Sequence, residues 1–216
     1  MTFCLDTTII KPENNVEIKN AIILLHGYGG DGKDISVLSL NWRRHLPNTV
    51  FICPNGHERC HINPSGYQWF DLSNEDPKYI LTQSQRAEKK LSQFIDEVKK
   101  EYNLDNDKIC LSGFSQGCMM SINLGLTADK KFNCVVGFSG KIIDPEDLKL
   151  RKKVATSTLL IHGDADQVVM PNFLLEAKDF FIRNDIEIET HLIKGCDHHI
   201  PIEASSIALN YILKKF

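Results

Sequence analysis

One serine of this chain lies in a pattern typical of a catalytic nucleophile. Gly113, Ser115 and Gly117 form a G-x-S-x-G sequence directly after the apolar run Ile109–Leu111. A strand, a very tight turn and a helix would present the Ser115 hydroxyl at the sheet edge, and the two glycines leave room where neighbouring backbone passes close by. The pattern is short enough to arise by chance, so the rest of the sequence decides what it means.

Acids and histidines follow this serine in an order known from catalytic triads. Asp164 and Asp166 come first, and His198 and His199 come after a later strand-like segment. A serine hydroxyl becomes a good nucleophile only when a histidine accepts its proton, and a carboxylate must hold that histidine in the right tautomer. Both pairs follow strands, at the edge of a parallel sheet where sites are built. The pattern leaves open which aspartate and which histidine act.

A glycine-rich segment near the start of the chain could stabilise a developing negative charge. It runs from His26 to Gly32 and reads HGYGGDG. Its glycines let backbone N–H groups turn toward an oxyanion, and the N–H of Gln116 would supply a second donor. The same segment fits the dinucleotide pattern G-x-G-x-x-G, which also needs an acid at the end of the second strand. The chain has Cys53-Pro54-Asn55 there, so nucleotide binding is not favoured.

Parallel strands linked by helices are expected to position these residues, because apolar runs alternate with helical patterns along the chain. Most runs are solidly apolar, as in strands that helices cover on both faces. We expect strands at 21–25, 49–53, 109–111, 134–136, 158–161 and 186–193, and helices at 82–102, 116–126, 171–183 and 202–213. Two longer stretches, 54–80 and 139–157, are expected to form walls or a small lid over the site.

Five motifs together resemble a known family. LHGYGGDG, QWFD, GFSQG, HGDADQVV and a histidine after GCD are similar to the carboxylesterase/phospholipase family of α/β-hydrolases, which includes acyl-protein thioesterases. The resemblance runs in order along essentially the whole chain. It implies an α/β-hydrolase fold with a mostly parallel central sheet, helices on both faces and no large cap domain. We therefore expect a single domain over residues 1–216.

The resemblance also implies roles for individual residues. It assigns a catalytic triad of Ser115, Asp166 and His198, oxyanion N–H groups of Tyr28 and Gln116, and a substrate-binding wall of Trp69 and Phe70. The family often has Gly-Met before its histidine, where this chain has Cys196-Asp197 and a second histidine after His198. The match to the family's motifs still favours His198 over His199, and Asp166 over Asp164. His26 and His162 each precede a glycine at a strand end and are expected to be structural hydrogen-bonding groups.

The activity that the resemblance implies is hydrolysis of carboxylic esters or thioesters through an acyl-enzyme, as in carboxylesterases, acyl-protein thioesterases and lysophospholipases. Alternatives on the same fold are a dienelactone-hydrolase-like enzyme, a peptidase, or a binding protein without activity. The sequence leaves open the acyl-chain length, the choice of ester or thioester, and whether the substrate is a lipid, a lipidated protein or a small ester.

Composition excludes several other classes of protein. The 216 residues are 42% hydrophobic and 25% charged with a net charge of −3, so no basic surface for nucleic acid is expected. An odd number of cysteines, seven, and a start without a signal-like segment favour a reduced, cytoplasmic protein without stable membrane insertion. His57, Cys60 and His61 lack a second cluster, so neither a metal nor a cofactor is expected. A homodimer is compatible with the sequence.

Overall fold

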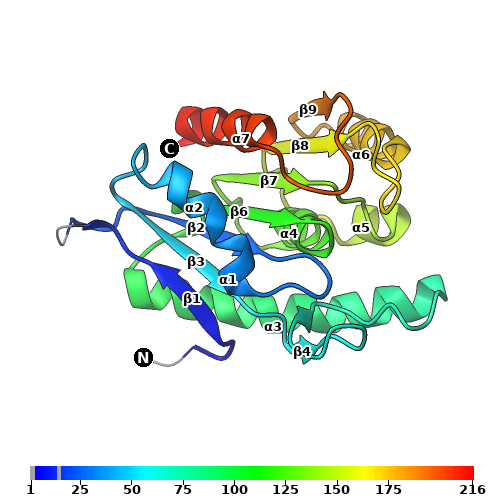
Figure 1. Cartoon of the computed structure of the whole chain (residues 1–216), viewed down its shortest axis with the longest axis horizontal. Helices are drawn as coiled ribbons and strands as arrows, with labels where there is room; N and C mark the ends of the chain where they lie inside the picture. Colours follow the sequence, from blue (N-terminus) through cyan, green and yellow to red (C-terminus); the bar gives the residue numbers. More distant parts are fainter. Residues whose placement is uncertain (1–2, 14–15) are drawn as a thin grey trace.

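A mostly parallel sheet lies at the centre of the protein. The structure is a computed structural model that describes residues 3–13 and 16–216. Its seven-stranded sheet has the order β1-β3-β2-β6-β7-β8-β9 (Figure 1). The strands are β1 (Thr7–Ile10), β2 (Asn20–Leu25), β3 (Thr49–Pro54), β6 (Ile109–Phe114), β7 (Cys134–Phe138), β8 (Thr158–Gly163) and β9 (Ile188–Ile193). Strand β1 is antiparallel to β3, whereas the other pairs of this sheet are parallel.

Helices cover both faces of the sheet, as the sequence predicts (Figure 1). One layer contains α3 (Pro77–Tyr102), α4 (Gln116–Thr127), α5 (Pro145–Arg151) and α6 (Asn172–Arg183), and the other contains α1 (Gly32–Ile35), α2 (Val37–Trp42) and α7 (Ile202–Lys215). Successive side chains of a strand point to opposite faces. In β2, Ile23 and Leu25 accordingly pack in the core beneath α3, while Ile22 and Leu24 pack beneath α2 and α7.

The longest helix, α3, begins earlier than the sequence pattern predicts. The Asp76 carboxylate accepts a hydrogen bond from the N–H of Lys78, and Pro77 occupies the first turn, where a missing N–H costs nothing. The helix ends at Tyr102 and is capped by Asn103 in the left-handed conformation, with φ 51°. The stretch 54–80 therefore contains the first turn of α3, together with the short antiparallel pair β4 (Glu58–Arg59) and β5 (Tyr67–Gln68).

Strand β1 and helices α1, α2 and α5 are not among the predicted elements. Each is short, from four to seven residues. Helix α5 lies inside the stretch 139–157, and its start is capped by Asp144, whose carboxylate accepts from the N–H of Asp147. Among the helices of the described residues, none is both long and apolar enough to cross a bilayer.

Candidate active site

Ser115 lies on a sharp turn between β6 and α4. Its backbone has φ 54° and ψ −116°, a strained conformation for a residue with a side chain. A Cβ on Gly113 would overlap the backbone of Gly117, and a Cβ on Gly117 would overlap the carbonyl of Leu25. The two glycines are thus needed because three backbone segments converge at the turn. The strand–turn–helix expected around the serine is present.

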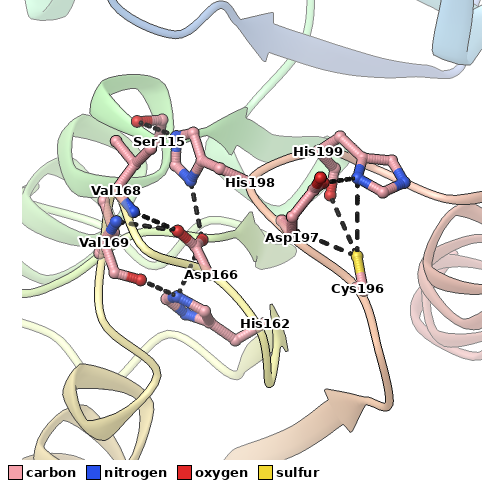
Figure 2. A network of polar contacts seen from close by, with 9 residues as sticks. All are labelled: Ser115, His162, Asp166, Val168, Val169, Cys196, Asp197, His198 and His199. Atoms are coloured by element: carbon pink, nitrogen blue, oxygen red, sulfur yellow. Dashed lines mark hydrogen bonds and ion pairs between the residues drawn. The ribbon is translucent and has the colours of Figure 1, made fainter.

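His198 joins this serine to Asp166 in a continuous chain of hydrogen bonds (Figure 2). The His198 Nε2 atom lies 3.1 Å from Ser115 Oγ, and its Nδ1 atom lies 2.7 Å from Asp166 Oδ2. Because the carboxylate accepts from Nδ1–H, Nε2 is left free to accept the serine proton. Asp166 follows β8 and His198 follows β9, so the three groups converge at the carboxyl ends of the parallel strands.

The carboxylate of Asp166 is buried and well supplied with donors. Its Oδ1 accepts from the N–H groups of Val168 and Val169, each at 2.9 Å. Burial acts to raise the pKa of Asp166, but the hydrogen bonds from His198, Val169 and Val168 outweigh it and hold the pKa below its usual value. His162 Nε2 donates to the Val169 carbonyl at 2.7 Å, and burial lowers the pKa of His162. The predicted structural role of His162 is confirmed, because it fixes the loop that carries Asp166.

The other two candidates, Asp164 and His199, take part in different contacts. Asp164 Oδ1 accepts from the N–H of Gly195 at 2.6 Å, which ties the loops after β8 and β9 together. His199 points away from the serine in Figure 2 and pairs with the exposed carboxylate of Asp197. Its Nδ1 also lies 3.9 Å from Cys196 Sγ. The geometry therefore favours Asp166 and His198 over Asp164 and His199.

Two backbone N–H groups are available beside the nucleophile. A Cβ on Gly27 would lie 2.9 Å from the Phe114 ring and 3.4 Å from the Cβ of Ser115, so the backbone that leads into Tyr28 passes close to the nucleophile. Among the described residues, no backbone carbonyl accepts from the N–H of Tyr28. Gln116 is the first residue of α4, and the first N–H groups of a helix have no partner within it. The helix dipole adds to the preference of this spot for negative charge.

His26 holds the glycine-rich segment in place. Its Nδ1 donates to the Gly27 carbonyl at 2.7 Å, and its Nε2 accepts from the N–H of Gly56 at 2.8 Å. The indole N–H of Trp69 donates to the His26 carbonyl at 2.9 Å. Burial lowers the pKa of His26, which suits a ring that must keep Nε2 unprotonated. The predicted structural role of His26 is thus confirmed.

The Gln116 side chain makes two contacts beside the site that the sequence analysis missed. Its Oε1 accepts from the N–H of Trp69 at 3.0 Å, and its Nε2 donates to the Phe70 carbonyl at 2.7 Å. Trp69 and Phe70 are 1% and 2% exposed, so their side chains lie in the core and support the site from behind. Their direct contact with substrate stays a prediction.

Comparison with known proteins identifies the family. A model of the phospholipase/carboxylesterase family matches residues 6–215. The chain belongs to this family. The acyl-protein thioesterase 1 of Schizosaccharomyces pombe is 26% identical over 199 residues, covering 88% of this chain and 86% of that protein. The Escherichia coli esterase YpfH is 24% identical over 88% of this chain and 81% of its own length.

Solved structures of esterases share the fold of this family member. The crystal structure of esterase PE8 superposes with a TM-score of 0.93 at 31% identity, covering 98% of this chain and 99% of that one. A Bacillus cereus carboxylesterase superposes with a TM-score of 0.79 at 18% identity, over 99% of this chain and 95% of its own. The predicted family, the α/β-hydrolase fold and the class of enzyme, a carboxylic ester hydrolase, are confirmed.

Proposed function

We propose that this protein hydrolyses carboxylic esters or thioesters through a Ser115–His198–Asp166 triad and an acyl-enzyme intermediate. The observation that carries the proposal is the unbroken set of contacts from Ser115 Oγ through the His198 ring to the buried Asp166 carboxylate, at 3.1 and 2.7 Å. Such a chain activates a hydroxyl that is otherwise a poor nucleophile.

In the first half of the reaction, Ser115 Oγ attacks the carbonyl carbon of the substrate and its proton moves to His198 Nε2. The N–H groups of Tyr28 and Gln116 bind the oxyanion that forms, which stabilises the transition state more than the ground state. The bond from carbon to the leaving oxygen or sulfur then breaks, and His198 gives that atom the proton. The alcohol or thiol departs and leaves Ser115 acylated.

In the second half, water attacks the acyl-enzyme and passes a proton to His198 Nε2. The bond between the acyl carbon and Ser115 Oγ breaks, the proton returns to Oγ, and the carboxylic acid leaves. Asp166 stays ionised throughout and stabilises the imidazolium that forms in each half. The lowered pKa of Asp166 fits this role, because its carboxylate remains charged at neutral pH.

The cysteines support the proposal that the enzyme works in a reducing compartment such as the cytoplasm. All seven are free thiols, and only Cys4 is exposed. Free buried thiols are usual in reducing compartments, whereas secreted proteins pair their cysteines.

Replacement of the nucleophile tests the function directly. Ser115→Ala should abolish labelling by a fluorophosphonate probe and reduce kcat for p-nitrophenyl esters and for acyl thioesters by about 10⁵-fold or more. Ser206→Ala is the matched control, since this exposed hydroxyl donates only to a carbonyl of its own helix. Labelling of the Ser115→Ala protein would overturn the assignment of the nucleophile. Turnover of lactones or peptides alone by the unaltered protein would favour the other enzymes of this fold.

A further inference from the structure

A cavity of about 390 Å³ opens next to the catalytic histidine, on the side of α1 and α2. Most of its wall is apolar and is formed by Ile35, Val37, Leu38, Phe114 and Ile200. The imidazole ring of His198 also lines it. Its volume lies in the range of small-molecule sites. It has room for about a dozen water-sized groups, at roughly 30 Å³ each.

The wall is continuous with the reacting groups. The rings of Phe114 and His198 pack with their centroids 4.7 Å apart, so the apolar surface reaches the proton-transferring imidazole itself. Tyr28, whose N–H faces the oxyanion in the proposed reaction, also lines the cavity. The Val37 side chain in this wall is apolar and 60% exposed. A bound apolar group would remove its surface from water, which is favourable. The cavity is therefore a continuation of the site.

The position of His198 determines which part of a substrate the cavity can receive. The tetrahedral carbon carries Ser115 Oγ, the oxyanion, the leaving group and the acyl group. His198 must protonate the leaving atom, so that atom lies beside Nε2 within hydrogen-bonding reach. A cavity with the His198 ring in its wall therefore begins where the leaving group is, and the acyl group takes the remaining direction.

A carboxylate in the lining makes the cavity less suitable for negatively charged ligands. Asp34 also lines the cavity, beside His26 and His199, and its exposed carboxylate disfavours an anion there. An apolar wall with a single carboxylate suits an uncharged hydrocarbon body rather than a phosphate or a carboxylate.

We propose that this cavity is a leaving-group subsite that binds the apolar body of a neutral alcohol or thiol. The inference rests on the proposed function, and it makes esters and thioesters with medium-sized apolar leaving groups the preferred substrates. Hydrolysis releases that alcohol with the proton from His198, as described above. In the reverse sense, an alcohol in the cavity attacks the acyl carbon of the acyl-enzyme and gives its proton to His198. The bond between that carbon and Ser115 Oγ breaks, Oγ takes the proton from His198, and the new ester leaves.

Filling the cavity should change selectivity for the leaving group alone. Val37→Phe should lower the ratio of kcat/KM for hexyl acetate to that for methyl acetate by about tenfold, because a pocket change of this size alters discrimination by ~10–200-fold at most. Leu40→Phe is the matched control. Leu40 lies on the same helix and is 59% exposed, but it does not line the cavity, so the ratio should stay within about twofold.

A second series separates the two halves of the substrate. The acyl chain is lengthened from methyl acetate to methyl hexanoate, and Val37→Phe should leave this preference unchanged. A change confined to the acyl series would mean that the cavity holds the acyl chain and would overturn the proposal. Equal ratios for the unaltered protein and both variants would overturn it as well, while the hydrolysis of esters would still stand.

Interception of the acyl-enzyme gives an independent readout. With p-nitrophenyl acetate as donor, added hexanol should compete with water and yield hexyl acetate, measured by mass spectrometry against acetate. Val37→Phe should lower this yield by about tenfold and leave the yield of methyl acetate from methanol unchanged. An unchanged hexyl acetate yield would count against the subsite. No turnover of any ester or thioester by the unaltered protein would instead refute the proposed function itself.

Discussion

Two histidine–aspartate pairs lie close together in this chain, and they differ in burial and in what else the histidine contacts. His198 contacts Asp166, and His199 contacts Asp197, each through Nδ1. The Asp166 side chain is fully buried, whereas that of Asp197 is 76% exposed. Of the two imidazoles, only His198 also contacts Ser115 among the described residues.

The difference shows that a histidine beside a carboxylate is not in itself a catalytic device. An exposed ion pair contributes little, because water screens it and two side chains must be ordered. Asp166 is excluded from water and accepts two backbone N–H bonds in addition to the histidine. These donors keep it charged and immobile, which is what orients the imidazole.

Replacing each carboxylate by its amide would test the comparison with the largest expected effect. Asp166→Asn should lower kcat by about 10⁴-fold, since the amide would favour the wrong tautomer of His198. Asp197→Asn should change kcat by less than about twofold. Steady-state kinetics with one p-nitrophenyl ester would measure both. Equal losses in the two variants would show that the outer pair takes part in catalysis.

The same contrast can be drawn between two glutamines. Gln116→Ala would leave the buried N–H of Trp69 and the carbonyl of Phe70 unpaired, which should reduce the free energy of unfolding by about 2–3 kcal/mol. It should also lower kcat, because the backbone N–H of Gln116 would be less well placed. Gln93→Ala removes an exposed contact to Glu97 and should cost less than ~0.5 kcal/mol.

Urea unfolding, together with kcat, would decide this second comparison. A loss of activity in Gln116→Ala without a loss of stability would mean that the amide touches the substrate instead of holding the loop.

The smallest expected effect concerns pH and the buried His26. Its pKa is lowered from 6.5, first by burial, against the opposing pull of the Gly27 carbonyl, Asp31 and Asp34. The unfolded state therefore binds protons at a higher pH than the folded state, so stability falls as the pH drops below about 6.5. His26→Gln should reduce this acid-side slope and leave the part due to His162, whose pKa is also lowered.

Unfolding by urea at a series of pH values between about 7.5 and 5 would measure the slope. An unaltered slope in His26→Gln would show that the protonated ring finds another arrangement in the folded protein.

Elements with a strong local signal could be predicted from the sequence. Strands such as β2 and β8 are apolar on both faces because helices cover both, and solid apolar runs are visible without a structure. The edge strand β1 is short and partly exposed, so it lacks that signal. The start of α3 at Pro77 and the start of α5 at Pro145 carry capping residues, which a closer search for Asp-Pro pairs would have found.

The candidate site shows the same division between features with a local sequence signal and features without one. The order of serine, acid and histidine limits the triad to two aspartates and two histidines, but the choice depends on contacts between distant loops. Asp164 is occupied by Gly195, 31 residues away. The Gln116 amide bonds to Trp69 and Phe70, 47 and 46 residues away. No local pattern contains such pairings, because they arise only when the sheet brings its loops together.

The positive φ of Ser115 has a consequence for the evolution of this fold. A residue with a side chain held at φ 54° costs about 1–3 kcal/mol, which glycine would largely avoid. Selection for stability alone would therefore replace this serine with glycine and gain folding free energy while losing the nucleophile. The chain carries serine here despite that cost, as expected of a position where the proposed reaction needs a hydroxyl. In a relative that no longer needed the reaction, replacement of this serine by glycine would relieve the backbone strain and stabilise the fold.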